Sequence, residues 1–450
     1  MPREDLAWRI AGFVEAYDFD KLSADRQARV ALCCLDFLAL AAVSSKLPEA
    51  RAARLMAEPG PVSLPGIGEG LSETSAIVAL GYTGALLQLH DGYGRGGNHP
   101  SSALVPVAWV MGRNHSLNER LGALALGYEV ANRLSEATHP AQSVRGSAPT
   151  ATMGAIGAAA IAAKLAGLDR RGIAEALSIA AIFAPLAPYE ALRVHGSAVP
   201  FHGAMAGRAG VEAARLAAAG LAGGDTVLEG RPGAAGMLEF LKGAGAGVSD
   251  PETWEGQTLD LVYFKSVPGC RHVQPALDAL ARIQPSAAEV GQILRIEVGT
   301  YPLALAFAIP PAADYALYDR LMSLNWAVAA SALYGGMSVD IASAVPDASA
   351  LDAMIAKTVI AEDPDMTELY PARLAARVTL TFANGESRSA VSDLLYGEEP
   401  DFEALTPAGG HLPSLSRAAL IARDTAFLAP VWGGAEADLV AQVTQIATGR

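Results

Sequence analysis

The chain has 450 residues, more than one hydrophobic core usually organises, so we expect two domains. Hydrophobic residues make up 51% of the sequence and charged residues 18%, a balance that excludes disorder over most of the length. The net charge of −14 opposes non-specific binding to nucleic acid or anionic membranes, and three cysteines, two of them adjacent, make no disulfide framework and fit a reducing cytoplasm.

The N-terminal segment is predicted to belong to the fold and not to a targeting signal. Residues 1–6 carry acids where a secretion signal would have basic and then apolar residues, so we expect a cytoplasmic protein. The longest apolar runs are interrupted by Asp36 and Lys164 and are rich in alanine and glycine. We interpret them as buried helices and expect neither a membrane nor a nucleic acid as partner.

The most informative segment is the glycine-rich stretch 89–102, which lies between two apolar helical runs. It brings His90, Asp91, Arg95 and His99 within ten residues of each other. Groups of this kind are costly to bury unpaired, whereas flanking helices can hold them around an anionic substrate. A polar surface loop is the alternative, because such loops also favour glycine, asparagine and histidine.

Two other interpretations of this stretch are disfavoured. Gly92, Gly94 and Gly97 match the pattern G-x-G-x-x-G, but they follow a predicted helix over 76–89 and not a strand. A dinucleotide site is therefore not predicted. The spacing of the two histidines matches no standard zinc pattern and the cysteines lie far away in sequence, so we predict no metal site.

Helical patterns dominate the first half of the chain. From Glu4 to about Ala219, apolar residues recur at steps of three and four, and Gly, Pro and Asn mark the loops. Ser116 and Glu119 form an S-x-x-E capping box in front of a helix over 117–136. The next helix carries a face of small residues, which predicts close packing deep in a helical bundle.

Composition changes near residue 261. β-branched alternation in 293–298 and 377–382 predicts strands, and Asn384-Gly385 predicts a two-residue type I′ hairpin turn. Helices are expected over 274–283 and 314–333, so a small α+β domain spans 262–401. Residues 415–447 return to helical periodicity. We therefore predict a mainly α fold: a large all-helical domain (1–261 plus 402–450) and a smaller α+β domain (262–401).

Four segments in this order and spacing resemble the MmgE/PrpD family, which includes dehydratases, a decarboxylase and an epimerase of small carboxylic acids. They are His90-Asp91 with 99–102, 149–159, 201–210 and 265–272. The resemblance implies a helical domain built from both chain ends, an α/β lid and a cofactor-free cleft between them. It also implies a homodimer that acts on small di- or tricarboxylates.

The resemblance implies roles for particular side chains. Asp91 and His99 match the acid/base positions of the family, with His99 as base or acid and Asp91 as a group that orients or donates a proton. Lys265 and Arg271 of the lid, with Arg95 opposite them, would hold substrate carboxylates. Lys265 is also counted among the catalytic groups, because a cation stabilises the developing enediolate.

Further site residues are implied with less distinct roles. The resemblance implies that His272 is the catalytic histidine of the lid, and it also allows Cys270 at that position. Cys270 is expected to contact substrate and not to act as a nucleophile, because no paired base is evident. Substrate contacts are also predicted from Ser101, Thr150 and His202.

Each of these assignments has a structural alternative. His99 could cap the helix that follows Pro100, Lys265 and Arg271 could form a solvated face, and His202 could pack structurally.

Two departures from the family pattern alter the expected reaction. Ala148 stands where many members have a histidine, and Val199 where many have a lysine; Arg145 or Arg193 are candidates to compensate. We therefore predict a cofactor-independent lyase, of dehydratase or decarboxylase type, acting by proton transfer α to a carboxylate on a small carboxylic acid. The alternatives are an epimerase or isomerase of a small dicarboxylate, and a catalytically degenerate metabolite-binding protein.

Overall fold

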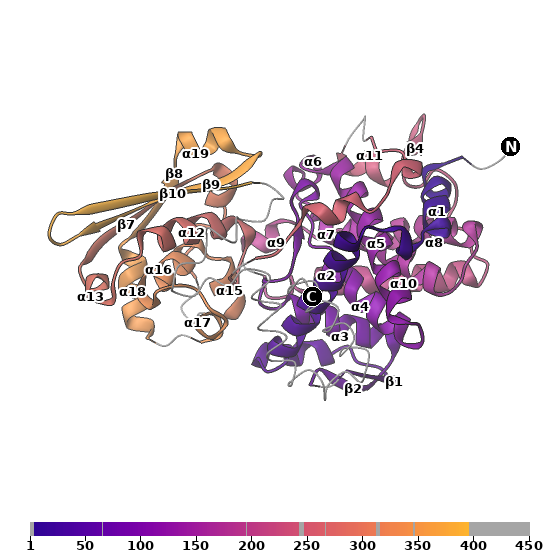
Figure 1. The fold of residues 1–450 in the computed structure, drawn as a ribbon, viewed down its shortest axis with the longest axis horizontal. Coiled ribbons are helices and arrows are strands. Elements are labelled where there is room, and N and C mark those ends of the chain that lie inside the picture. The colour runs from indigo at the N-terminus through magenta and orange to yellow at the C-terminus, as the bar shows by residue number, and fades with distance from the viewer. Residues whose placement is uncertain are drawn as a thin grey trace.

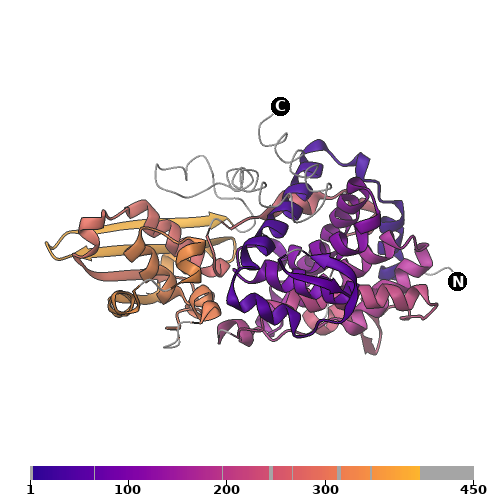
Figure 2. The ribbon, with the colours of Figure 1, turned by 90° about the horizontal axis from the view of Figure 1, so that it is seen from below.

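The computed structural model describes residues 4–395, apart from residues 65, 195, 243–246, 266, 312–315 and 345–346. Figures 1 and 2 show these residues as two bodies side by side, a larger helical one and a smaller one that contains a sheet. Each body has its own main hydrophobic core. The predicted fold class, mainly α with a smaller α+β part, is confirmed.

The larger body is built mostly from long helices. These are α1 (Leu6–Ala16), α2 (Ala24–Ser44), α3 (Glu73–Ala85), α4 (Ser101–Met111), α5 (Leu117–Thr138), α7 (Pro149–Leu165), α8 (Arg170–Phe183) and α10 (Phe201–Ala218). Shorter helices are α6 (Ala141–Val144), α9 (Glu190–Arg193) and α11 (Met237–Lys242). The capping box before α5 is confirmed, because Ser116 and Glu119 exchange both side-chain-to-backbone hydrogen bonds.

The sequence predicted that this body is purely helical, but it also contains short strands. It also holds the hairpins β1 (Pro59–Leu64) with β2 (Gly68–Leu71) and β4 (Gly230–Arg231) with β5 (Ala234–Ala235). In addition, β3 (Gly92–Tyr93) pairs antiparallel with β6 (Val262–Tyr263).

The small residues of α7 allow the close packing that the sequence predicts. A methyl group on Gly157 would lie 2.8 Å from the carbonyl oxygen of Gly127 on α5, and one on Gly210 of α10 would lie 2.6 Å from that of Ala155. Helix α2 is long and apolar enough to cross a membrane, but 78% of its most apolar window is buried inside the fold. It is therefore a core helix of the larger body.

The smaller body, which we call the lid, consists of a four-stranded sheet and helices. The strand order is β10–β9–β7–β8, with β7 (Ile293–Thr300) parallel to β8 (Thr358–Glu362) and antiparallel to β9 (Arg373–Phe382), which pairs with β10 (Ser387–Leu395). The helices are α12 (Gln274–Ile283), α13 (Ala287–Val290), α14 (Pro302–Leu305), α15 (Leu317–Met322), α16 (Leu324–Tyr334), α17 (Val339–Ser343), α18 (Ala348–Ala356) and α19 (Pro364–Leu369). Alternate residues of β9 are buried, and α12 packs against β9 and β10.

Two expectations for the C-terminal half change, and a third falls on residues that the structure does not describe. The helix expected over 314–333 is two helices, because Ser323 caps α16 with its side chain; residues 314 and 315 lie outside the described residues. The hairpin at Asn384-Gly385 is confirmed but its turn is not type I′. Only Gly385 of the pair has a positive φ, +83°, and its N–H donates to the Phe382 carbonyl at 2.9 Å. A type I turn followed by a left-handed glycine needs just one positive φ. The predicted helical tail, 402–450, lies outside the described residues.

The chain leaves the core of the helical body a few residues after position 261, where the sequence predicted the boundary. Val262 and Phe264 belong to the core of the helical body, and Val267 is the next residue to join the core of the lid. Pairing between β3 and β6 explains the difference, because it ties the segment that leads into the lid to the loop in front of α4.

Candidate active site

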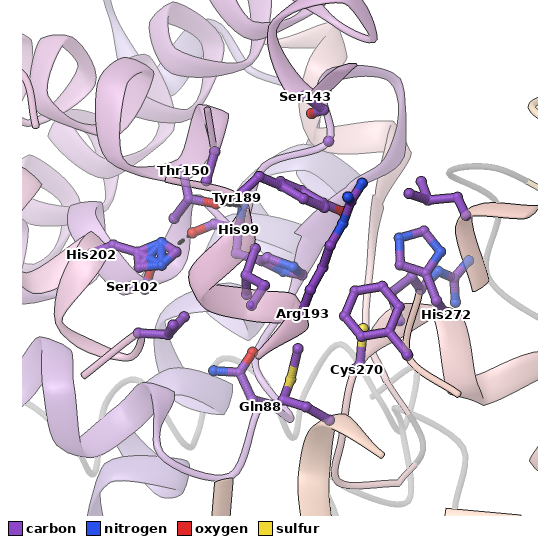
Figure 3. A pocket seen from close by; sticks show the side chains of 18 of the residues that line it. Gln88, His99, Ser102, Ser143, Thr150, Tyr189, Arg193, His202, Cys270 and His272 are labelled. Atoms are coloured by element: carbon purple, nitrogen blue, oxygen red, sulfur yellow. Dashed lines mark hydrogen bonds between the residues drawn. The ribbon is translucent and has the colours of Figure 1, made fainter. Parts of the chain in front are cut away.

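A cavity of about 250 Å³ lies between the two bodies and is lined by both. This volume is slightly below the ~300–1,000 Å³ of most ligand pockets, which suits a small molecule. His99, Thr150 and His202 reach it from the ends of three helical segments, and Lys265, Arg271 and His272 reach it from the segment entering the lid. Figure 3 shows the labelled side chains converging from the two bodies. Histidine 99 and the basic residues of the lid therefore meet, although more than 160 positions separate them.

The loop in front of α4 is held by close contacts that only glycines allow. Gly92 lies against the ring of Tyr263, and a methyl group there would overlap the tyrosine hydroxyl. Gly97 has a φ of +62°, and a methyl group there would meet the ring of His139 at 2.5 Å. The left-handed conformation at Gly97 turns the chain towards Asn98 and His99.

We expect Gly92→Ala to weaken this arrangement. The added methyl group displaces the buried Tyr263 ring and disturbs the β3–β6 pair, so the free energy of unfolding should fall by about 1–3 kcal/mol. Urea unfolding measures this change, and Gly291→Ala, where a methyl group meets open space, is the control. Equal stability of the two variants would contradict the prediction.

His99 is oriented by two hydrogen bonds. Its Nδ1 lies 2.7 Å from the backbone carbonyl oxygen of Asp91, and its backbone N–H donates to the Thr150 hydroxyl at 3.0 Å. Because a carbonyl oxygen only accepts, Nδ1 carries the hydrogen, and Nε2 keeps its lone pair. The imidazole is thereby set up as a base at the cavity.

The charge environment keeps His99 neutral. Burial, followed by the positive charge of Lys265, lowers the pKa of His99 to about 3. Burial also lowers the pKa of His272 to about 3, with the charges of Arg271 and Lys265 adding to the effect. A bound anion beside these cations would offset their effect and raise both pKa values.

Asp91, expected to orient or donate a proton, is buried behind the cavity and is not part of its lining. Its carboxylate accepts hydrogen bonds from the hydroxyl and backbone N–H of Ser101 and, at 2.6 Å, from the hydroxyl of Tyr128. Burial raises the pKa of Asp91, although these hydrogen bonds oppose the shift. Asp91 orients His99 through its carbonyl oxygen.

Two predicted substrate contacts are also placed elsewhere. Arg95 is exposed and is not part of the cavity lining, because the short helical turn 94–96 directs it to the surface. Ser101 is buried and bonded to Asp91, so it supports the loop from behind. Both differences arise from the direction of the backbone in the loop.

The predicted cations of the lid do line the cavity, so they are not a solvated face. Lys265 is 2% exposed, and its Nζ donates to the carbonyl oxygen of Gln88 at 2.6 Å. Arg271 is buried with its guanidinium 4.1 Å from the centre of the Tyr263 ring. Among the described lining residues there is no aspartate or glutamate. Such a lining favours a negatively charged ligand.

His272 is fixed on the lid side. Its Nδ1 lies 2.7 Å from the hydroxyl of Tyr301, and its ring stacks on Phe307 at 5.2 Å between centroids. Cys270 also lines the cavity, but burial raises the pKa of its thiol to about 11. The thiol is therefore protonated at neutral pH, which argues against a nucleophilic cysteine.

The two positions that depart from the family pattern both border the cavity. Ala148 precedes α7 and Val199 precedes α10, and both are buried. Arg193 lines the cavity too and takes a position between His99 and Cys270 in Figure 3. Arg145 instead donates to the carbonyl oxygen of Phe240 and is not part of the lining. Of the two arginines considered, only Arg193 lines the cavity.

Several lining residues were not predicted from the sequence, among them Gln88, His139 and Tyr189, and His90 was noted there without a role in the site. Gln88 is buried with a φ of +50°, a conformation that non-glycine residues seldom adopt. That conformation presents its carbonyl oxygen to Lys265. Tyr189 and Arg193 belong to the long connection between α8 and α10, and the length of this connection, which long functional loops share, was the one available signal.

Acid should destabilise this fold through its cavity histidines. Burial lowers the pKa of His99 and His272 to about 3 and that of His139 and His202 to about 4, all below the unfolded value of about 6.5. The unfolded chain then binds more protons below pH 6.5, so the stability that these histidines contribute is complete above pH 6.5 and is lost as the pH falls from 6.5 to about 3. The slope of the unfolding free energy against pH gives the number of protons taken up on unfolding. We expect this number to be smaller by about one in His202→Gln near pH 5, as measured by urea unfolding between pH 7.5 and 5. An unchanged slope would contradict this.

No group of three or more His, Cys, Asp or Glu side chains placed to hold a metal ion occurs among the described residues. Comparison with protein families gives two matches. Residues 8–243 match the family model described as MmgE/PrpD N-terminal domain, and residues 267–404 match that described as MmgE/PrpD C-terminal domain. A comparison with curated proteins finds no match.

Proposed function

Because this chain belongs to the MmgE/PrpD family, whose members are generally enzymes of dehydratase or lyase type, we propose that it is a cofactor-independent lyase. Its substrate is a small carboxylic acid, and the reaction begins with removal of the proton α to a carboxylate.

One observation carries this proposal. The His99 imidazole has Nδ1 bonded to a backbone carbonyl and Nε2 left as a base, and it borders the same cavity as Lys265 and Arg271. An α-proton is weakly acidic, so its removal needs a positioned base together with cations at the developing enediolate oxygens. The described cavity lining combines both requirements and has no acidic side chain that would repel a carboxylate.

The proposed steps follow from this geometry. Arg271 and Lys265 bind the substrate carboxylate, and this anion raises the pKa of the neighbouring imidazoles. Nε2 of His99 takes the α-proton, and the electrons of the broken C–H bond move into the carboxylate, where Lys265 stabilises the charge. Reformation of the carbonyl then expels the β-substituent, to which His272, once protonated, gives its proton.

Epimerisation is the second candidate, and the placement of two imidazoles favours it. His99 belongs to the helical body and His272 to the lid, and Figure 3 shows them on two sides of the cavity. One base could remove the α-proton from one face of the substrate, while the other returns a proton to the opposite face.

Proton NMR of the purified protein with pooled di- and tricarboxylates in deuterated buffer tests the proposal. Loss of the α-proton signal with appearance of an alkene or loss of CO₂ is the expected result for a lyase. Deuterium incorporation with only a change of configuration would identify an epimerase. Ligand binding without any exchange, unaltered by His99→Gln, would contradict both reactions and identify a metabolite-binding protein.

A further inference from the structure

The cavity has a hydrocarbon side that the proposed proton transfer does not use. Five lining residues, which we call the apolar wall, belong to the core of the lid or pack against it: Leu192, Val199, Cys270, Phe307 and Met322. Leu192 and Val199 come from the connection between α8 and α10, whereas the other three come from the lid. One continuous apolar surface therefore crosses the junction of the two bodies and ends at the cavity.

The composition of this wall is unusual for a site that would bind only carboxylates. The thiol of Cys270 is protonated and behaves as a small apolar group. Phe307 and Met322 are each 1% exposed, and their side chains offer neither a donor nor a strong acceptor to a carboxylate. A carboxylate placed against them would lose water without gaining hydrogen bonds, which is costly.

Few side chains of the described lining carry a permanent positive charge. Lys265 and Arg271 are the buried cations of the described lining, and the third, Arg193, lies 3.8 Å from the carboxylate of Glu190. Two buried cations match one or two carboxylates. The apolar wall borders the same cavity as these cations.

Building on the proposed function, we propose that the substrate is a mono- or dicarboxylic acid with a hydrocarbon branch. The carboxylate lies at Lys265 and Arg271, and the alkyl branch lies against the apolar wall. Removal of the branch from water supplies the affinity that further carboxylates would supply in a more cationic site.

The test measures binding, separated from turnover by the His99→Gln variant. Isothermal titration compares succinate, methylsuccinate, propylsuccinate and propane-1,2,3-tricarboxylate. We expect the dissociation constant to fall about fourfold for each added methylene, and propylsuccinate to bind more tightly than the tricarboxylate. Equal affinities along the alkyl series, or tightest binding of the tricarboxylate, would overturn the proposal.

Variants of the wall give a second readout. Val199→Thr keeps the shape but adds a hydroxyl, so propylsuccinate should bind about 3–10-fold more weakly while succinate is unaffected. Val359→Thr, at a residue of β8 that is 42% exposed and not part of the lining, is the matched control. If Val199→Thr does not fold, the half-buried Leu192→Ala takes its place. Equal loss for both ligands would contradict the proposed position of the branch.

The two proposals can fail separately. Alkyl-dependent binding without α-proton exchange in the wild-type protein would contradict the lyase and leave the ligand class standing. Exchange of the α-proton of tricarboxylates, with no increase in affinity from an alkyl group, would support the lyase and reject the apolar wall as a substrate contact.

Discussion

Replacing His99 with glutamine should lower the rate of α-proton exchange by about 10²–10⁴-fold, the usual contribution of a positioned general base. Glutamine can still donate a hydrogen bond to the Asp91 carbonyl, so the loop keeps its shape while the titrating base disappears. Exchange of the substrate α-proton is measured by NMR in deuterated buffer.

The pH dependence separates a base from a merely structural histidine. Burial and the Lys265 charge lower the pKa of His99 to about 3 in the unliganded cavity. The fall of kcat/KM with decreasing pH that reports protonation of His99 should therefore lie well below pH 6.5, and it should be missing in His99→Gln. His115→Gln is the control, since His115 is not part of the cavity lining. Wild-type exchange rates in His99→Gln would remove His99 from the mechanism.

Replacing Lys265 with methionine should slow the chemical step by about 10²–10³-fold, comparable to the removal of one donor from an oxyanion site. Lys265 is the second cause of the lowered pKa of His99, after burial. The variant should therefore also raise that pKa, which NMR titration of the imidazole measures. A structural lysine would not produce this pair of effects.

The same variant should affect stability far less than it affects the chemical step. Lys265 is buried, and removing a buried charge relieves its desolvation cost, so the free energy of unfolding should change little. Lys164→Met is the matched control, because Lys164 also donates to backbone carbonyls, those of Val14, Glu15 and Tyr17, but lies outside the cavity lining. That control should lower stability and leave kcat unchanged. A similar loss of kcat in both variants would contradict a specific role of Lys265.

Local patterns in the sequence predicted much of the fold. The capping box before α5, helix α12 and the hairpin of β9 and β10 each depend on residues close together in the chain, and all three were predicted correctly. The turn type was wrong, because Asn-Gly is compatible with more than one turn and the register of the strands selects among them.

Part of the candidate site could also be predicted from local patterns in the sequence. His99 and the Lys265–His272 segment carry chemistry that is recognisable from residue type, and both line the cavity. Whether a neighbouring side chain faces the cavity depends on the path of the loop. Asp91 and Arg95 stand near His99 in sequence, yet one is bonded behind the cavity and the other is exposed.

The order of residues alone determined where most of the long helices and the strands β7, β9 and β10 form, and which segments carry acid, base and cation, because these properties depend on side-chain type and short-range periodicity. Only the tertiary structure decided that β3 pairs with β6, that Gln88 adopts a strained conformation facing Lys265, and that Leu192 and Val199 join the core of the lid. Those arrangements arise from contacts between distant segments, whose energies no local pattern records.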